Sequence, residues 1–128
     1  MIYRWFVRKQ ALAVWAKLSD QRIDELPLAD DVHFVNLGDH PLAADLHGAE
    51  AEREWLRELF RRLPNLRFEV DDMIIEGGPW ATRVATRYAA TRNGQVVYRG
   101  TNFGRIVWGK IVEERILPDT QALAAALA

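Results

Sequence analysis

The sequence predicts an α+β protein in which N-terminal helices pack on a curved, mainly antiparallel sheet. Three observations support this fold class. Apolar residues recur at three- and four-residue steps in segments 5–18 and 49–63, strand-like alternation runs through residues 66–117, and turn sequences containing glycine interrupt that alternation. Helices first and a meander of strands last is an α+β order, in which helices cover one face of the sheet and leave the other exposed.

Two helical segments are predicted before the first strand. Residues 5–18 form an amphipathic helix with a tryptophan-rich face. Ser19 and Asp20 can cap a short second helix, which ends at Leu26 because Pro27 disfavours helical geometry in the residue before it.

One strand and one long loop follow. Residues 32–37 are β-branched and aromatic and end at Gly38, which predicts a strand. The ten residues from 39 to 48 contain a proline and mixed polarity, so we expect a loop, and long loops often carry function.

Residues 49–63 form the clearest predicted helix. Glu50 and Glu52 lie near its N-terminus, where the helix dipole is positive, and Arg61 and Arg62 lie near its negative end. We interpret the charges of Glu54, Arg57, Glu58 and Arg61 as a solvated face, with a partner surface as the alternative.

The second half of the chain predicts four antiparallel strands joined by tight turns. The segments share alternating polarity and cover residues 66–76, 80–91, 95–107 and 111–117. Asn93 and Gly94 tolerate the positive φ of a hairpin turn, and Gly109 folds the last strand back. A short alanine-rich segment after Asp119, a possible helix cap, ends the chain.

Composition excludes several classes of function. The chain has 128 residues, 49% of them hydrophobic, and a chain of this length buries roughly two-thirds of its unfolded surface, so we expect one domain over residues 1–128. Its 17 basic and 18 acidic residues nearly balance, which argues against a nucleic-acid partner. Cysteine is absent, which excludes disulfides and thiolate chemistry, and the single serine, Ser19, makes a serine hydrolase improbable.

The sequence also argues against a membrane partner. No segment approaches the roughly 20 apolar residues that span a bilayer, and Arg4, Arg8 and Lys9 interrupt the N-terminal apolar stretch. We therefore expect a cytoplasmic protein.

Four local sequences and their order resemble the nuclear transport factor 2-like superfamily, specifically its SnoaL-like branch. They are ADDV (29–32), LHGAE (46–50), GKIVEE (109–114) and PD (118–119). That branch includes polyketide cyclases, and its relatives include ketosteroid isomerases and limonene epoxide hydrolases. The resemblance covers nearly the whole chain. It implies a cone-shaped half-barrel whose mouth binds a small apolar molecule, commonly in a dimer.

The positions that resemble the catalytic sites of these relatives carry different residues here. The similar cyclases have a histidine where this chain has Asn102 and an aspartate where it has Ile116, and the epoxide hydrolases also have an aspartate at Ile116. Ketosteroid isomerases have aspartates near Asn36 and Asn102. An isoleucine cannot accept a proton, whereas an amide can donate a hydrogen bond to a carbonyl or an oxyanion.

Glu114 is the candidate catalytic residue. Alternation in the last strand places it with Val112 and Ile116 on a face that is otherwise apolar, and places Glu113 on the opposite face. We expect Glu114 to be the only ionisable residue deep in the cone, where a carboxyl suits acid–base chemistry near neutral pH. A bulge would reverse the choice between the two glutamates. The alternative is a glutamate that is paired with an arginine or lies at the solvated rim or the dimer face.

The candidate ligand-binding residues are polar or large side chains predicted near the cone. They are Trp15, Asn36, Asp39, His40, Tyr88, Asn102 and Ile116. Asp39 and His40 are expected at the pocket mouth, with turn formation as their alternative role. Gly104, in the middle of a strand, marks either space for a ligand or a bend in the sheet.

No metal site and no cofactor are predicted. His33, His40 and His47 recur at seven-residue intervals, which on a helix would line one face. Pro41 and the flanking glycines forbid such a helix, so the spacing carries no metal prediction.

Two functions remain open at this point. The first is an enzyme that catalyses proton transfer, isomerisation or cyclisation of an apolar carbonyl compound, with Glu114 as its acid or base. The second is a non-catalytic ligand-binding or interaction module of the same fold. For either, we expect a homodimer packed through the outer face of the sheet, where Phe103, Trp108 and Leu117 are the apolar candidates.

Overall fold

The computed structural model describes residues 2–128 and confirms the α+β class. Over these residues the chain forms three α-helices, one short 3-10 helix and a six-stranded, unclosed sheet. In chain order the elements are α1 (Ile2–Ser19), η1 (Ile23–Glu25), β1 (Leu28–Asn36), β2 (Ala44–His47), α2 (Ala49–Arg62), β3 (Leu66–Gly78), β4 (Ala81–Arg92), β5 (Gln95–Val107), β6 (Lys110–Pro118) and α3 (Thr120–Leu127).

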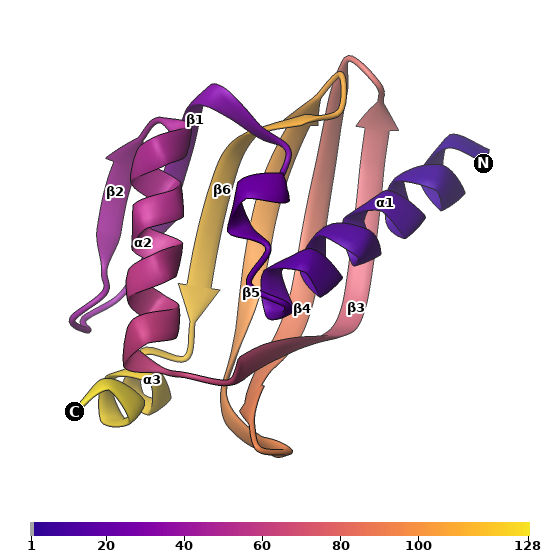
Figure 1. Ribbon diagram of the computed structural model, residues 1–128. Helices are drawn as coiled ribbons and strands as arrows, with labels where there is room; N and C mark the ends of the chain where they lie inside the picture. The colour runs from indigo at the N-terminus through magenta and orange to yellow at the C-terminus, as the bar shows by residue number, and fades with distance from the viewer. Residues whose placement is uncertain (1) are drawn as a thin grey trace.

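The sheet brings the first strand of the chain, β1, beside the last strand, β6. Its strand order is β2-β1-β6-β5-β4-β3, and every neighbouring pair is antiparallel except β1 and β6, which run parallel (Figure 1). The parallel pairing sets Phe34 of β1 beside Glu114 of β6, and Asn36 beside Ile116. Residues 80 positions apart in the sequence therefore share one surface.

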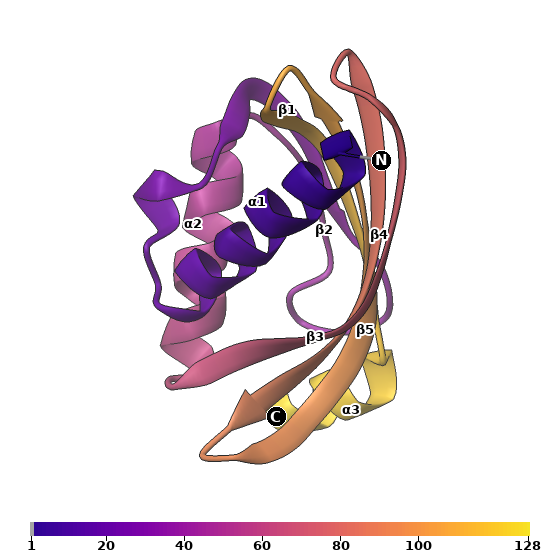
Figure 2. The same ribbon diagram turned by 90° about the vertical axis from the view of Figure 1, so that its right-hand side faces the viewer.

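The sheet curves around α1 and α2, which both lie on its concave side (Figure 2). The buried face of α2 carries Leu56, Leu59 and Phe60, and these side chains form the main core with Val32 of β1 and Leu66 of β3. Burial of one such side chain stabilises the fold by about 1.5–3 kcal/mol. This packing holds the two helices above the concave face.

Strand β2 lies inside the segment that was expected to be a loop. It has four residues, pairs only with β1, and alternates in exposure. Its sequence ADLH contains one large apolar residue, too little for a period-two pattern to be recognised. Strand β1 also begins earlier than residue 32, because Leu28 pairs with Ile111 before an irregularity in the register.

The last hairpin contains a bulge. Arg105 pairs with Glu113 and Ile106 pairs with Ile111, so Val112 is an extra residue on β6. Consequently Ile111, and not Val112 as alternation alone predicted, lines the concave side together with Glu114. The bulge lies before Glu113, so it leaves the inward orientation of Glu114 unchanged.

The C-terminal segment is a helix, and Asp119 is its cap. The Asp119 side chain accepts a hydrogen bond from the backbone N–H of Ala122 at 3.1 Å. Leu123 of α3 is buried and belongs to the main core, so this helix closes the end of the cone opposite the β5–β6 turn (Figure 2). Among residues 2–128, no helix is long and apolar enough to cross a membrane.

Candidate active site

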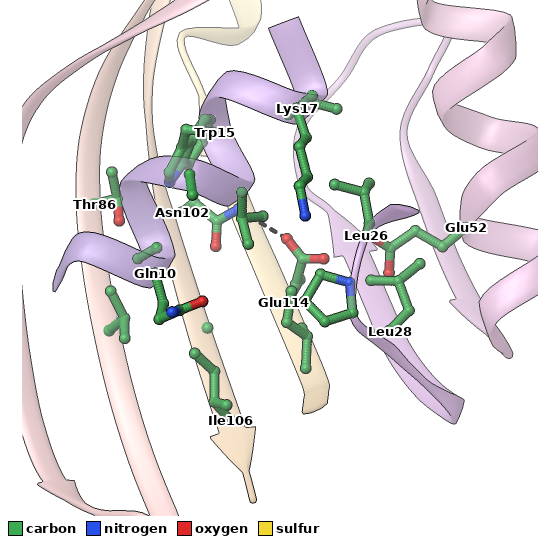
Figure 3. Close-up of a pocket in the computed structure, with 18 of the residues that line it drawn as sticks. Gln10, Trp15, Lys17, Leu26, Leu28, Glu52, Thr86, Asn102, Ile106 and Glu114 are labelled. Carbon is green, nitrogen blue, oxygen red and sulfur yellow. Dashed lines mark hydrogen bonds between the residues drawn. The ribbon is translucent and has the colours of Figure 1, made fainter. Parts of the chain in front are cut away.

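A cavity of about 560 Å³ lies between α1, α2 and the concave face of the sheet (Figure 3). Its walls are largely apolar and include four aromatic side chains from different elements. These are Trp15, Phe34, Phe68 and Tyr88. Volumes of roughly 300–1,000 Å³ with mostly apolar walls are typical of sites for small organic molecules.

Glu114 enters the cavity from β6. It accepts a hydrogen bond at 3.0 Å from Nδ2 of Asn102, which lies on the neighbouring strand β5 (Figure 3). Its Cα partner on β5 is Gly104, where an added Cβ would meet no atom closer than 3.7 Å. The glycine therefore leaves open space beside the carboxylate.

Glu113 points the other way, as the alternation predicted. On the outer face of β6 its two carboxylate oxygens lie 3.5 Å from Arg105 and 3.5 Å from Arg115. It contributes nothing to the cavity.

A second carboxyl, Glu52, reaches the same cavity from α2. Only 2% of the residue is exposed, and its Oε1 has no hydrogen-bond partner. Burial, and then the nearby Glu114 carboxylate, raise the pKa of Glu52 far above its usual value, so that this carboxyl holds its proton at neutral pH. The expectation from the sequence that Glu114 is the only ionisable group in the cone is therefore wrong.

The sequence assigns Glu52 only to the positive N-terminal end of its helix, although a signal of its burial is present. Glu52, Leu56, Leu59 and Leu63 stand at positions i, i+4, i+7 and i+11, so the glutamate continues the buried stripe of α2. A charged residue on a buried stripe is a stronger indication of a functional role than a charged residue on the exposed face of the helix.

Lys17 is a further charged residue that sequence analysis did not assign to the site. It lies in the last turn of α1, lines the cavity, and directs its ammonium group toward the Glu114 carboxylate (Figure 3). A cation, a carboxylate and a protonated carboxyl thus meet in one apolar chamber.

The two predicted amide residues both line the cavity, and His40 orients one of them. Nδ1 of His40 accepts the Leu42 backbone N–H at 3.1 Å, so the ring proton is on Nε2, which donates to Oδ1 of Asn36 at 2.9 Å. With its oxygen occupied, Asn36 is left with its NH₂ group as the donor available to the cavity.

Six of the eight predicted site residues line the cavity, and two do not. Those that line it are Trp15, Asn36, Tyr88, Asn102, Glu114 and Ile116. Asp39 and His40 lie outside the lining, because the turn after β1 directs the His40 ring back onto Asn36 and Leu42. The expectation of a loop pair at the pocket mouth is therefore wrong, although His40 acts on the site through Asn36.

The aromatic wall is continuous and neutral. Trp15 and Tyr88 have ring centroids 5.2 Å apart, and Phe68 lies 5.5 Å from Tyr88. Burial raises the pKa of Tyr88, so its phenol stays protonated.

Comparisons with known proteins agree with this fold. The family described as SnoaL-like domain matches residues 9–114. No curated protein matches the chain.

Solved structures share the fold at low sequence identity. Bal32a, from a soil-derived mobile gene cassette, is 13% identical with a TM-score of 0.77, over 94% of this chain and 95% of that one. An NTF2-like protein of unknown function from Cytophaga hutchinsonii is 17% identical with a TM-score of 0.67, over 91% and 92%. An LEH-like epoxide hydrolase from M. tuberculosis is 20% identical with a TM-score of 0.62, over 93% and 86%.

Proposed function

Because this chain belongs to the SnoaL-like domain family of the NTF2-like superfamily, we propose that it binds a small apolar carbonyl compound and catalyses proton transfer on it, as in an isomerisation or a cyclisation. One observation carries the proposal. Glu52 and Glu114 share an apolar cavity, and burial beside Glu114 keeps the Glu52 carboxyl protonated at neutral pH. A carboxyl that keeps its proton can act as a hydrogen-bond donor or general acid, and a second carboxyl in the same site can act as the base.

Each residue has a defined role in this reaction. The Glu114 carboxylate takes a proton from the carbon next to the carbonyl, which breaks a C–H bond and forms an O–H bond on Glu114. Negative charge then develops on the carbonyl oxygen, where the protonated Glu52 carboxyl and the Asn36 amide are the available donors. In a carbonyl compound with a neighbouring C=C bond, return of the proton from Glu114 to the far carbon of that bond shifts the double bond and completes an isomerisation without a cofactor.

Asn102 and Lys17 position the base. The amide of Asn102 holds one oxygen of Glu114, and Lys17 supplies a positive charge on the α1 side of the carboxylate. The Asn102 hydrogen bond orients the carboxylate, and a fixed orientation is a large part of catalysis in a preorganised site.

A non-catalytic ligand-binding module is the second candidate. Ile116 lines the cavity at the position that carries an aspartate in the similar cyclases and epoxide hydrolases, and it can neither take nor give a proton. A binding module would use the same apolar walls without needing Glu114 to change its protonation state.

Hydrogen exchange distinguishes the two candidates without knowledge of the product. Apolar ketones and enones are incubated with the chain in D₂O, and loss of the signals of hydrogens next to the carbonyl is followed by ¹H NMR. Catalysed exchange of any panel member supports the enzyme, and a ligand that binds without exchange supports the binding module.

Ligand binding is expected to stabilise the chain, and a side chain at position 104 is expected to abolish that effect. A ligand at about one hundred times its dissociation constant adds roughly 2.7 kcal/mol to the free energy of unfolding. Gly104→Phe fills the open space beside Glu114, so the ligand-induced rise in melting temperature should disappear. Thr101→Phe, on the outer face of the same strand, is the control and should keep the full rise. An equal rise in both variants would place the ligand outside the cavity.

The outer face of the sheet is expected to form a homodimer interface. Ile74, Ala85 and Phe103 are Cα partners in register across β3, β4 and β5, and Phe103 and Leu117 are 41% and 49% exposed. Trp108, which we had expected on this face, lies in the β5–β6 turn beside the cavity. In light scattering the wild-type chain should be dimeric and Phe103→Asp monomeric, since a carboxylate in the apolar row opposes burial. A wild-type monomer at all concentrations would contradict this expectation.

A further inference from the structure

The pairing of β1 with β2 brings two histidines and an aspartate together outside the cavity. His33 on β1 and His47 on β2 are Cα partners, and their rings stack with centroids 4.3 Å apart. Asp45 lies two residues before His47, on the same face of β2, and its Oδ1 is 2.7 Å from Nε2 of His33 and 3.8 Å from Nε2 of His47.

The seven-residue spacing of His33, His40 and His47 has a different meaning in a hairpin than in a helix. As a helical pattern the spacing predicts no metal site, because Pro41 forbids a helix through this segment. In an antiparallel pair, however, residues equally distant from the turn lie opposite each other, so His33 meets His47 although the chain between them is not helical. His40, midway between them, lies in the connecting turn and belongs to the Asn36 contact instead.

The cluster has the donor types and the spacing of a transition-metal site. One ligand atom from each of the three residues lies within 4.8 Å of the others. Around a tetrahedral ion with bonds of about 2.0–2.2 Å, ligand atoms are roughly 3.3–3.6 Å apart. The two separations to Asp45, 2.7 and 3.8 Å, lie on either side of that range. The imidazole rings are nearly parallel, so binding of one ion by both requires them to tilt toward each other.

We propose that His33, Asp45 and His47 bind one divalent transition-metal ion, with zinc as the best-fitting member of the class. Two imidazoles and a carboxylate are a ligand set that zinc, cobalt, nickel and copper accept, whereas magnesium and calcium prefer oxygen donors alone. The site would leave at least one coordination position open to solvent, because His47 and Asp45 are exposed.

The site is separate from the cavity. Phe34 and Asn36, on either side of Val35, point into the cavity, so His33 points to the outer face of β1. There its neighbour on β6 is Glu113, which faces Arg105 and Arg115. Metal binding would therefore fasten β2, an edge strand of four residues, to the sheet without touching Glu114 or Glu52.

Metal titration of the untagged full-length chain tests the proposal. Zinc is titrated into the chelator-treated protein by calorimetry, and cobalt by visible absorption, which reports tetrahedral coordination. We expect one ion per chain. His47→Ala and Asp45→Ala should each weaken binding at least about tenfold, and because both side chains are exposed, neither change threatens the fold. His40→Ala removes a histidine that lies outside the cluster and should leave the affinity unchanged.

Two results would overturn the proposal. One is a wild-type chain that binds no ion in a one-to-one ratio. The other is a His47→Ala variant with the affinity of the wild type, which would place the ion elsewhere. Zinc should also slow amide hydrogen exchange in β2 of the wild type, and unchanged exchange in β2 at saturating zinc would equally contradict a bridge between the two strands.

Discussion

Glu114→Gln is expected to lower catalysed proton transfer by a factor of about 10² to 10⁴ and to leave the fold intact. Glutamine keeps the size of the side chain and its hydrogen-bond acceptor, so Asn102 can still donate to it. It cannot accept a proton at neutral pH, and the proposed reaction begins with that step. The measurement is the rate of deuterium exchange in D₂O for the most active compound of the panel, together with the melting temperature of each protein.

Glu113→Gln is the matched control for this experiment. It makes the same chemical change one residue away, on the outer face of β6, where the side chain contacts Arg105 and Arg115. Exchange should continue at the wild-type rate in this variant. If Glu114→Gln also catalyses exchange at the wild-type rate, the Glu114 carboxylate is not the base. The result would then favour the ligand-binding module as the function of the cavity.

Glu52→Gln is expected to stabilise the chain at neutral pH and to change how its stability depends on pH. The pKa of Glu52 is higher in the folded than in the unfolded chain, so above the unfolded value the folded state holds a proton that the unfolded state has lost. The free energy of unfolding therefore falls as pH rises, by up to about 1.4 kcal/mol per pH unit. From the unfolded pKa near 4.3 to pH 7 the loss reaches about 3 to 4 kcal/mol.

Urea unfolding of the wild type and the variant at several pH values between 4 and 7.5 measures this effect. The two proteins should differ little at pH 4, where Glu52 is protonated in both states, and the variant should be more stable by pH 7. Glu50→Gln, in the first turn of the same helix and exposed, should follow the wild type. Parallel pH profiles for Glu52→Gln and the wild type would show that Glu52 ionises normally in the folded chain, and would remove the proposed general acid.

The inward orientation of Glu114 was predictable because it depends on one element. Side chains alternate along a strand, so the apolar neighbours of Glu114 and the charged neighbours of Glu113 identified the two faces of β6. The bulge at Val112 was not predictable, because it depends on the pairing of β6 with β5 and leaves no mark in the alternation of β6 alone. As a result Ile111, and not Val112, lines the cavity with Glu114.

The helices and the strand meander were predictable for the same reason. Apolar periodicity and turn residues act locally, over the length of one helix or one hairpin, and the sequence alone determined the α+β class, the Asn93-Gly94 turn and the Asp119 cap. Strand β2 was missed because its four residues form a strand only when β1 is present to pair with them.

The second carboxyl and the histidine cluster were decided by tertiary structure alone. A sequence shows which residues share a face of one element, but which faces meet depends on the packing of all elements around one core. Glu52 of α2 meets Glu114 of β6 because the helix lies across the concave side of the sheet, and His33 meets His47 because the chain turns back between them. The stripe of α2 indicates that Glu52 faces inward, but the burial that keeps it protonated beside Glu114 exists only once the packing of helix on sheet has excluded water.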